Sequence, residues 1–175
     1  QGREVVEFLP LYVRCQGPVQ WWFFRSDPYT TRLPEQCPVS YPLESDGAAQ
    51  RFEQGMMVWI AAVGRVVVLF DEGTYRSFTT LPAPSTPQPL DETPPPGLFE
   101  PISGFGLLWR GEAPGSEDLR EWLGWAIEPE FYVHTAFQCY AEGEALTCFV
   151  RGPEAEIIRL KADGTWDIWP TERGS

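Results

Sequence analysis

Two stretches of this 175-residue chain resemble each other, and that internal similarity constrains the fold more than any other feature. The segment QRFEQG at 50–55 resembles QCYAEG at 138–143, at a spacing of 88 residues. The segment LFDEGTY at 69–75 resembles LKADGTW at 160–166, at a spacing of 91 residues. The difference indicates a short insertion near Gly152. A repeat at nearly constant spacing predicts one small structural unit that occurs twice.

Each copy alternates short apolar runs with turn residues, which is typical of antiparallel β-strands. The expected strands are 48–54, 56–61, 65–70 and 74–78 in the first copy and 133–141, 145–150, 156–161 and 165–169 in the second. With a turn centred on Gly55, Phe52 is expected to face Trp59. The predicted fold is therefore mainly β. It has two antiparallel β-meander repeats that pack on each other or on other segments, because a lone meander is marginally stable.

The chain divides into six segments. These are an N-terminal strand and aromatic segment (1–47), β repeat 1 (48–78), a Pro-rich strap (79–101), a short-helical connector (102–132), β repeat 2 (133–169) and a tail (170–175). In the connector, Ser116 is expected to cap a helix that ends at Gly124, with Leu119, Trp122 and Leu123 on one face.

The strap is rich in proline, serine and threonine, a composition typical of extended, O-glycosylated stalks or of plain surface linkers. Its candidate O-glycosylation sites are Thr80, Ser85, Thr86 and Thr93. The sequence leaves both alternatives open.

Four cysteines, Cys15, Cys37, Cys139 and Cys148, allow three disulfide pairings. A two-residue turn at Gly143-Glu144 would place Cys139 directly opposite Cys148, within disulfide reach. Pairing neighbours leaves Cys15 with Cys37. Two free thiols at 139 and 148 are the alternative.

Disulfides favour an extracellular or cell-surface protein. No signal peptide is visible, and the start at Gln1 fits a processed N-terminus or a chosen boundary. The most apolar stretch, 56–70, is interrupted by Gly64-Arg65 and is shorter than the roughly 20 residues of a membrane span, so no insertion into a membrane is expected.

Charge and composition exclude several classes of function. The net charge of −12 has the wrong sign for a nucleic-acid partner. The single histidine, His134, leaves no metal-ligand set and no Ser–His–Asp arrangement, so no cofactor or metal is expected and the protein is not predicted to be an enzyme. Carboxylate pairs of the glycosidase type or an acidic calcium site are weaker alternatives, because 25 acidic residues place some pairs close together by chance.

Aromatic residues make up 14% of the chain and suggest a surface that could bind carbohydrate. Tryptophan rings can stack on the apolar faces of sugars, although most tryptophans pack in cores. The candidate glycan platform comprises Trp21, Trp22, Trp125, Trp166 and Trp169.

The N-terminal run EVVEFL at 4–9 reads as a strand without an obvious hairpin partner. Its candidate assembly residues are Val5, Val6, Phe8 and Leu9, which could add to a sheet in the same chain or in a neighbouring copy.

Several phrases together resemble a known family. They are QxFExGxMxW at 50–59, GFGxxW at 104–109 and LGWAxxxE at 123–130, with QxYxxG at 138–143 and DGTW at 163–166 in the second copy. Residues 48–169 are similar to the paired LGFP repeats of secreted, cell-wall-associated bacterial proteins, with LGWA in place of LGFP. The resemblance implies an extracellular, non-catalytic module associated with envelope polymers and no defined active site.

Two functional hypotheses remain. The first is a secreted structural module that self-associates, as a filament or surface-layer subunit that uses its N-terminal strand, with copies of itself as partners. The second is a carbohydrate- or cell-wall-binding module of the LGFP-like type.

Overall fold

The computed structural model describes residues 37–39, 41–80, 92–142 and 145–169, which form a mainly β fold, as predicted. The strands are β1 (Cys37–Pro38), β2 (Leu43–Phe52), β3 (Gly55–Ile60), β4 (Arg65–Phe70), β5 (Tyr75–Thr79), β6 (Phe131–Glu142), β7 (Ala145–Arg151), β8 (Ile157–Leu160) and β9 (Trp166–Ile168). The helices are η1 (Ala61–Val63), α2 (Ser103–Trp109) and α3 (Leu119–Leu123). All eight strands predicted for the two copies are present.

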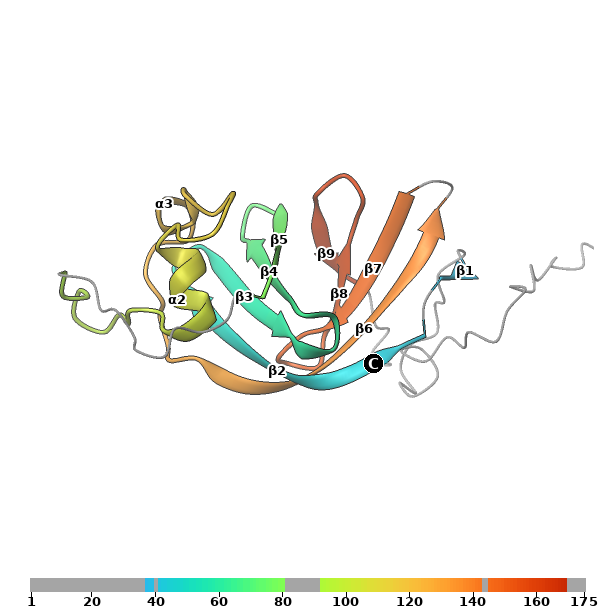
Figure 1. Cartoon of the computed structure of the whole chain (residues 1–175), viewed down its shortest axis with the longest axis horizontal. Coiled ribbons are helices and arrows are strands. Elements are labelled where there is room, and N and C mark those ends of the chain that lie inside the picture. The colour runs from blue at the N-terminus through green and yellow to red at the C-terminus, as the bar shows by residue number, and fades with distance from the viewer. Residues whose placement is uncertain (1–36, 40, 81–91, 143–144, 170–175) are drawn as a thin grey trace, which may run out of the picture.

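All these strands belong to one antiparallel sheet, in the order β5-β4-β3-β2-β6-β7-β8-β9, with β1 paired to β6. The order places β2–β5, here called half 1, on one side and β6–β9, half 2, on the other (Figure 1). The β2–β6 ladder joins them from Leu43 opposite Phe137 to Ala49 opposite Phe131. That the two halves are copies of one repeated unit stays a prediction.

The sheet curves until its two ends meet. Thr74, in the β4–β5 turn, forms an antiparallel bridge with Thr165, in the β8–β9 turn. In Figure 1 the two hairpins rise side by side above the β2–β6 base, so the sheet is nearly closed. Side chains that alternate along the strands therefore face either the space between the halves or the outside.

Three apolar clusters follow from this alternation. The inner cluster lies between the halves and includes Val58, Val67, Val150 and Ile158. The outer cluster of half 1 joins its sheet to α2 and α3. The outer cluster of half 2 consists of Ala136, Tyr140, Phe149, Ile157 and Trp169.

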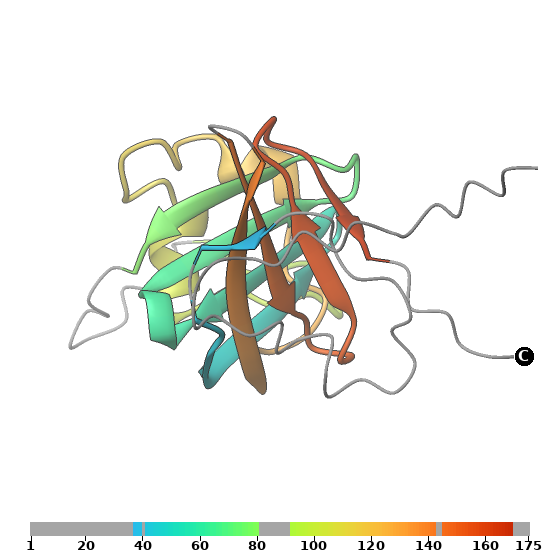
Figure 2. The same cartoon turned by 90° about the vertical axis from the view of Figure 1, so that its right-hand side faces the viewer.

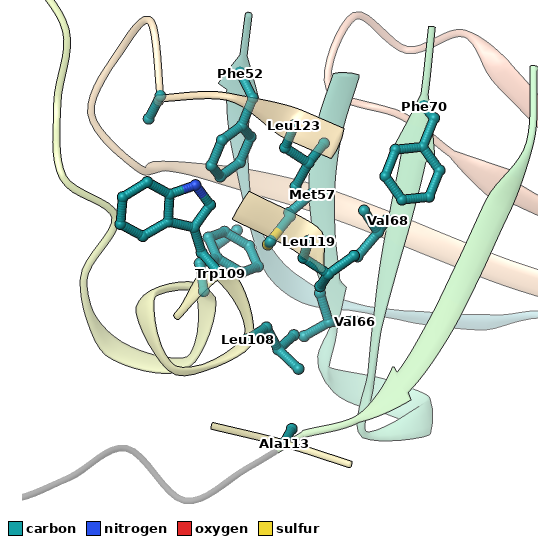
Figure 3. Close-up of a cluster of buried hydrophobic side chains, with 13 residues drawn as sticks. Phe52, Met57, Val66, Val68, Phe70, Leu108, Trp109, Ala113, Leu119 and Leu123 are labelled. Atoms are coloured by element: carbon teal, nitrogen blue, oxygen red, sulfur yellow. The ribbon is translucent and has the colours of Figure 1, made fainter. Parts of the chain in front are cut away.

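The two short helices form a layer on half 1 only. Leu119 and Leu123 of α3 face Met57 and Val68 of the sheet, and Trp109 of α2 lies beside them (Figure 3). All five side chains are almost fully buried. By the usual value of about 25 cal/mol per Å² of apolar area, a layer of this kind contributes several kcal/mol to the stability of half 1.

Two local expectations are wrong. Phe52 pairs with Gly55 and not with Trp59, because the turn is formed by Glu53 and Gln54 and Gly55 already belongs to β3. Ser116 does not cap α3. Its hydroxyl is buried and bonds the backbone of Ala113, donating to the carbonyl oxygen at 2.7 Å and accepting from the N–H.

The polypeptide enters the sheet at β1, the short blue strand in Figure 2. This strand pairs Cys37 with Ala141 and Pro38 with Tyr140 of β6. The backbone N–H of Val39 donates to the carbonyl oxygen of Cys139 at 2.9 Å. Among the described residues, no helix is long and apolar enough to cross a membrane.

Candidate functional site

Three of the sequence phrases, those at 50–59, 104–109 and 123–130, meet at one place, the junction between the β2–β3 hairpin and the segment after α3. Glu53 accepts a hydrogen bond from the backbone N–H of Trp125 at 2.8 Å, and its own N–H donates to the carbonyl oxygen of Trp125 at 3.0 Å. The indole N–H of Trp109 donates to the carbonyl oxygen of Gly124 at 2.7 Å. Ala126 forms bridges with both Phe52 and Phe99. These residues hold the helical layer onto half 1.

Close backbone approach explains two glycines of the same phrases. A Cβ on Gly55 would lie 2.2 Å from the carbonyl oxygen of Leu69, and a Cβ on Gly106 would lie 2.5 Å from that of Pro101. Real Cβ atoms do not approach backbone oxygen this closely, so only glycine fits.

The rings of Trp109 and Trp125 contact each other at this junction, with their centroids 4.9 Å apart, and an arginine lies against both. The guanidinium carbon of Arg120 lies 4.7 Å from the ring centroid of Trp109 and 4.9 Å from that of Trp125. Glu92 forms an ion pair with Arg120. The ring of Trp125, predicted to bind a glycan, is half-buried and engaged with the protein's own cation.

The other two described tryptophans of the predicted platform are also engaged. Trp166 is half-buried, and its indole N–H donates to the carbonyl oxygen of Phe70 at 2.9 Å. Trp169 is buried, packs edge-on against Phe149 and lies under the guanidinium of Arg159. Trp21 and Trp22 lie outside the described residues.

Sequence reasoning missed the most exposed aromatic residue in the described part of the chain. Tyr132 is 68% exposed, and its hydroxyl donates to Asp46 at 2.5 Å, which fixes the ring on the outer side of the β2–β6 ladder. His134 lies on the same strand and exposes half of its side chain, with Nε2 3.7 Å from Glu44. The alternation of side chains in β6 could have indicated that Tyr132 and His134 share a face of the sheet. It could not have indicated that this face is exposed to solvent.

The disulfide between Cys139 and Cys148 is present, at the register position that the hairpin count predicted. It links two neighbouring strands, β6 and β7. Cys15 lies outside the described residues, as does the side chain of Cys37, so their pairing stays a prediction.

Basic side chains form ion pairs with acidic residues that could otherwise bind a metal ion. Arg159 and Lys161 both contact Asp167, and the hydrogen bond from Arg159 is the main reason that the pKa of Asp167 is lowered. Arg76 binds Asp118 through both carboxylate oxygens and lowers its pKa in the same way. These carboxylates act as structural partners.

The acidic turn between β8 and β9 is organised by its own hydrogen bonds. Asp163 accepts bonds from the hydroxyl and the backbone N–H of Thr165, which lower the pKa of its carboxyl. Over the described ranges, no three His, Cys, Asp or Glu side chains are placed to hold a metal ion.

The remaining candidate positions are divided between the described and undescribed parts of the chain. Thr80 accepts a hydrogen bond from the indole N–H of Trp59 at 3.0 Å, and Thr93 is exposed. Ser85 and Thr86 lie outside the described residues, as do the assembly residues Val5, Val6, Phe8 and Leu9. O-glycosylation and strand donation both stay predictions.

Comparison with known proteins adds no relative. No protein-family model matches the chain, and no curated protein or solved structure matches it.

Proposed function

We propose that this protein is a non-catalytic, secreted structural module that self-associates through its N-terminal strand, as a subunit of a filament or surface layer. The observation that carries the proposal is the incomplete closure of the sheet. Among the described residues, β5 and β9 have a strand neighbour on one side only, apart from the bridge between Thr74 and Thr165.

An open sheet edge can accept an extended segment from another molecule, because its outward N–H and C=O groups form main-chain hydrogen bonds with the incoming strand. Ser77 and Thr79 of β5 are exposed, and Ile168 of β9 exposes half of its apolar side chain. The run at 4–9 provides a complementary donor, with Val5, Phe8 and Leu9 to bury.

Other features fit a durable extracellular scaffold. The disulfide between Cys139 and Cys148 clamps half 2 and is compatible with an oxidising compartment. The charge of −12 favours a solvated surface and disfavours non-specific collapse between copies, so association would depend on a specific contact.

Electron microscopy of the purified chain beside a chain that lacks residues 1–12 tests the proposal. We expect ordered polymers from the full chain and isolated particles from the truncated one. Isolated particles from both would contradict it. Polymers from both would show that association does not use the N-terminal strand.

The alternative function is binding to cell-wall or other extracellular polysaccharide. The observation in its favour is Tyr132, whose exposed ring is held by Asp46 beside the polar side chains of Glu44 and His134. Aromatic faces with hydrogen-bonding neighbours recognise sugars. A pull-down on insoluble cell-wall polymers should retain the chain and lose Tyr132→Ala. Equal retention of both, or of neither, would remove this alternative.

A further inference from the structure

Arginine side chains lie against aromatic rings at several places in the described fold, and a carboxylate binds each of these arginines. At one place, the guanidinium carbon of Arg76 lies 5.1 Å from the ring centroid of Trp122. Both carboxylate oxygens of Asp118 accept hydrogen bonds from Arg76, at 2.6 and 3.1 Å. Groups of the same composition are Phe131 with Arg51 and Glu128, Trp125 with Arg120 and Glu92, and Trp169 with Arg159 and Asp167.

Each of these groups combines two attractions. The negative face of an aromatic ring attracts a cation, and a carboxylate binds a guanidinium through charge-assisted hydrogen bonds. Arginine suits both partners at once, because its guanidinium is planar and presents several donors in a fixed fork. Lys161 is the only lysine of the chain, so the other 12 of its 13 basic residues are arginines. A ring and a carboxylate held side by side therefore form a receptor for an arginine.

Tyr132 and Asp46 supply the ring and the carboxylate of such a group without an arginine. The ring of Tyr132 is 68% exposed on the outer side of the β2–β6 ladder, and its hydroxyl donates to Asp46 at 2.5 Å. Asp46 is exposed as well. Within the described ranges, no arginine lies over this ring, and Asp46 has no ion-pair partner. The ring is thus held in place by one carboxylate oxygen, with its face open to solvent.

We infer that Tyr132 and Asp46 form a docking site for an arginine side chain on the basic surface of a separate protein partner. Charge complementarity supports this choice of occupant. Glu44 lies two residues from Asp46 on the same face of β2, and its exposed carboxylate contacts only His134, at 3.7 Å, in the described structure. The outward positions around Tyr132 carry no arginine or lysine; they are Glu44, Asp46 and Ala48 on β2 and His134 and Ala136 on β6.

The arginines of the described fold already have their own partners, which favours an occupant from another molecule. Those that form ion pairs are Arg51, Arg76, Arg110, Arg120 and Arg159. The net charge of −12 adds a general attraction for a basic partner and accelerates its approach. Stacking on Tyr132 then gives preference to arginine over lysine.

This inference does not rest on the proposed self-association. Tyr132 lies on β6, in the middle of the sheet, whereas self-association is assigned to the edge strands β5 and β9. The arginine also differs from the sugar that the alternative function places against the same ring, so an experiment must separate the two occupants.

Fluorescence anisotropy with two labelled peptides tests the inference at one fixed ionic strength. Both peptides have three basic residues separated by glycines, which are arginines in one and lysines in the other. We expect the arginine peptide to bind at least about tenfold more tightly. Tyr132→Leu and Asp46→Asn should each weaken its binding at least about tenfold.

Two variants control for exposure and for charge. Tyr41 is 57% exposed, so Tyr41→Leu removes a comparable ring elsewhere. Asp71 is exposed in the β4–β5 turn, so Asp71→Asn removes the same charge as Asp46→Asn. Neither control should change the affinity for the arginine peptide. Equal affinities for the two peptides, or equal losses in the controls, would show a general attraction to an acidic surface and overturn the inference.

Nuclear magnetic resonance supplies a direct measurement of the contact. The δ-methylene protons of a bound arginine should shift upfield and show cross-relaxation with the ring protons of Tyr132, and Tyr132→Leu should abolish the shift. A shift that persists in this variant would overturn the inference.

Two further outcomes would assign the site to another occupant. An oligomer of glucosamine that binds through Tyr132 more tightly than the arginine peptide would make the occupant a sugar. Loss of polymers in Tyr132→Leu under the electron microscope would make it a second copy of this chain. Either result would overturn a separate protein partner, whereas unchanged polymers with lost peptide binding would support it.

Discussion

The indole N–H of Trp166 donates a hydrogen bond to the backbone carbonyl oxygen of Phe70, and this contact joins the two ends of the sheet. A corresponding bond runs in the opposite direction, from the hydroxyl of Tyr75 to the carbonyl oxygen of Lys161 at 3.0 Å. Two backbone hydrogen bonds of 2.8 Å lie beside them. The N–H of Tyr75 donates to the carbonyl oxygen of Gly164, and the N–H of Trp166 donates to that of Gly73. The β4–β5 and β8–β9 hairpins, at the two ends of the sheet, are therefore joined by four hydrogen bonds in two matched pairs.

The first prediction concerns this closing contact. Tyr75→Phe should lower the free energy of unfolding by about 1 kcal/mol, because it removes a partly buried hydrogen bond and leaves the carbonyl oxygen of Lys161 with the N–H of Gly164 as its donor. Urea titration measures the change. Tyr132→Phe is the matched control, since it removes an exposed hydroxyl bonded to Asp46 and should cost less. A larger loss in the control would contradict the role given to Tyr75.

Alkaline pH should destabilise the fold through buried tyrosines. Burial raises the pKa of Tyr140 and of Tyr75, and the carboxylate of Asp163 adds to the rise at Tyr75. The native protein thus holds these protons where the unfolded chain, with an ordinary pKa of about 10, releases them. The contribution is complete below that pH and is lost as pH rises through the folded pKa values. Unfolding free energies measured beside tyrosinate absorbance should fall above about pH 10. A flat profile would contradict the prediction.

Acid should act through the arginine-bound carboxylates. Arg159 lowers the pKa of Asp167, so the native protein releases a proton that the unfolded chain still binds near pH 4. This contribution is present above the unfolded pKa and is lost as pH falls through the folded one. Asp167→Asn should therefore weaken the dependence of stability on pH below about 4. Unchanged acid sensitivity in the variant would show that other groups dominate.

Loss of the disulfide should cost about 2–3 kcal/mol, the chain-entropy value for a loop of this length. The Cys139→Ser/Cys148→Ser double variant, compared with the parent by thermal and urea unfolding, measures it. Hydrogen exchange should locate the loss in β6 and β7 and leave β3 and β4 nearly unchanged. Equal loosening of both halves would contradict a local clamp.

Gly55 combines a close backbone contact with a φ of +154°, whereas Gly64 has a left-handed backbone and open space. Gly55→Ala places a methyl group against the carbonyl oxygen of Leu69 and should cost more than about 2 kcal/mol. Gly64→Ala has open space and strains only a left-handed backbone, at about 1 kcal/mol. Denaturation of the two variants gives the comparison. A smaller loss at Gly55 would contradict the packing assigned to it.

Much of the fold could be predicted from the sequence, because its signals are local. The count that placed Cys139 opposite Cys148 needed only one turn of known length. The same reasoning failed at Gly55, because that glycine lies in β3, where its contact with Leu69 and its φ of +154° require it, and the turn is formed by the two residues before it. Sequence near Ser116 could not show that its hydroxyl would bond Ala113.

The joining of the halves and the site were harder to predict for a physical reason. The β2–β6 ladder pairs residues about ninety positions apart, such as Asp46 and His134, and such pairing has no local pattern. Likewise, the burial of Trp169 and the exposure of Tyr132 depend on which faces other segments cover. Composition identified the aromatic residues but could not rank them by exposure.

Self-association through the N-terminal strand is the central claim, and the mass of the protein in solution tests it most directly. Sedimentation of the full chain across a wide concentration range should give masses above the 19.9 kDa of one copy, rising with concentration. The Val5→Ser/Phe8→Ser double variant should sediment as a single copy throughout. A full chain that stays at 19.9 kDa at every concentration would contradict the account.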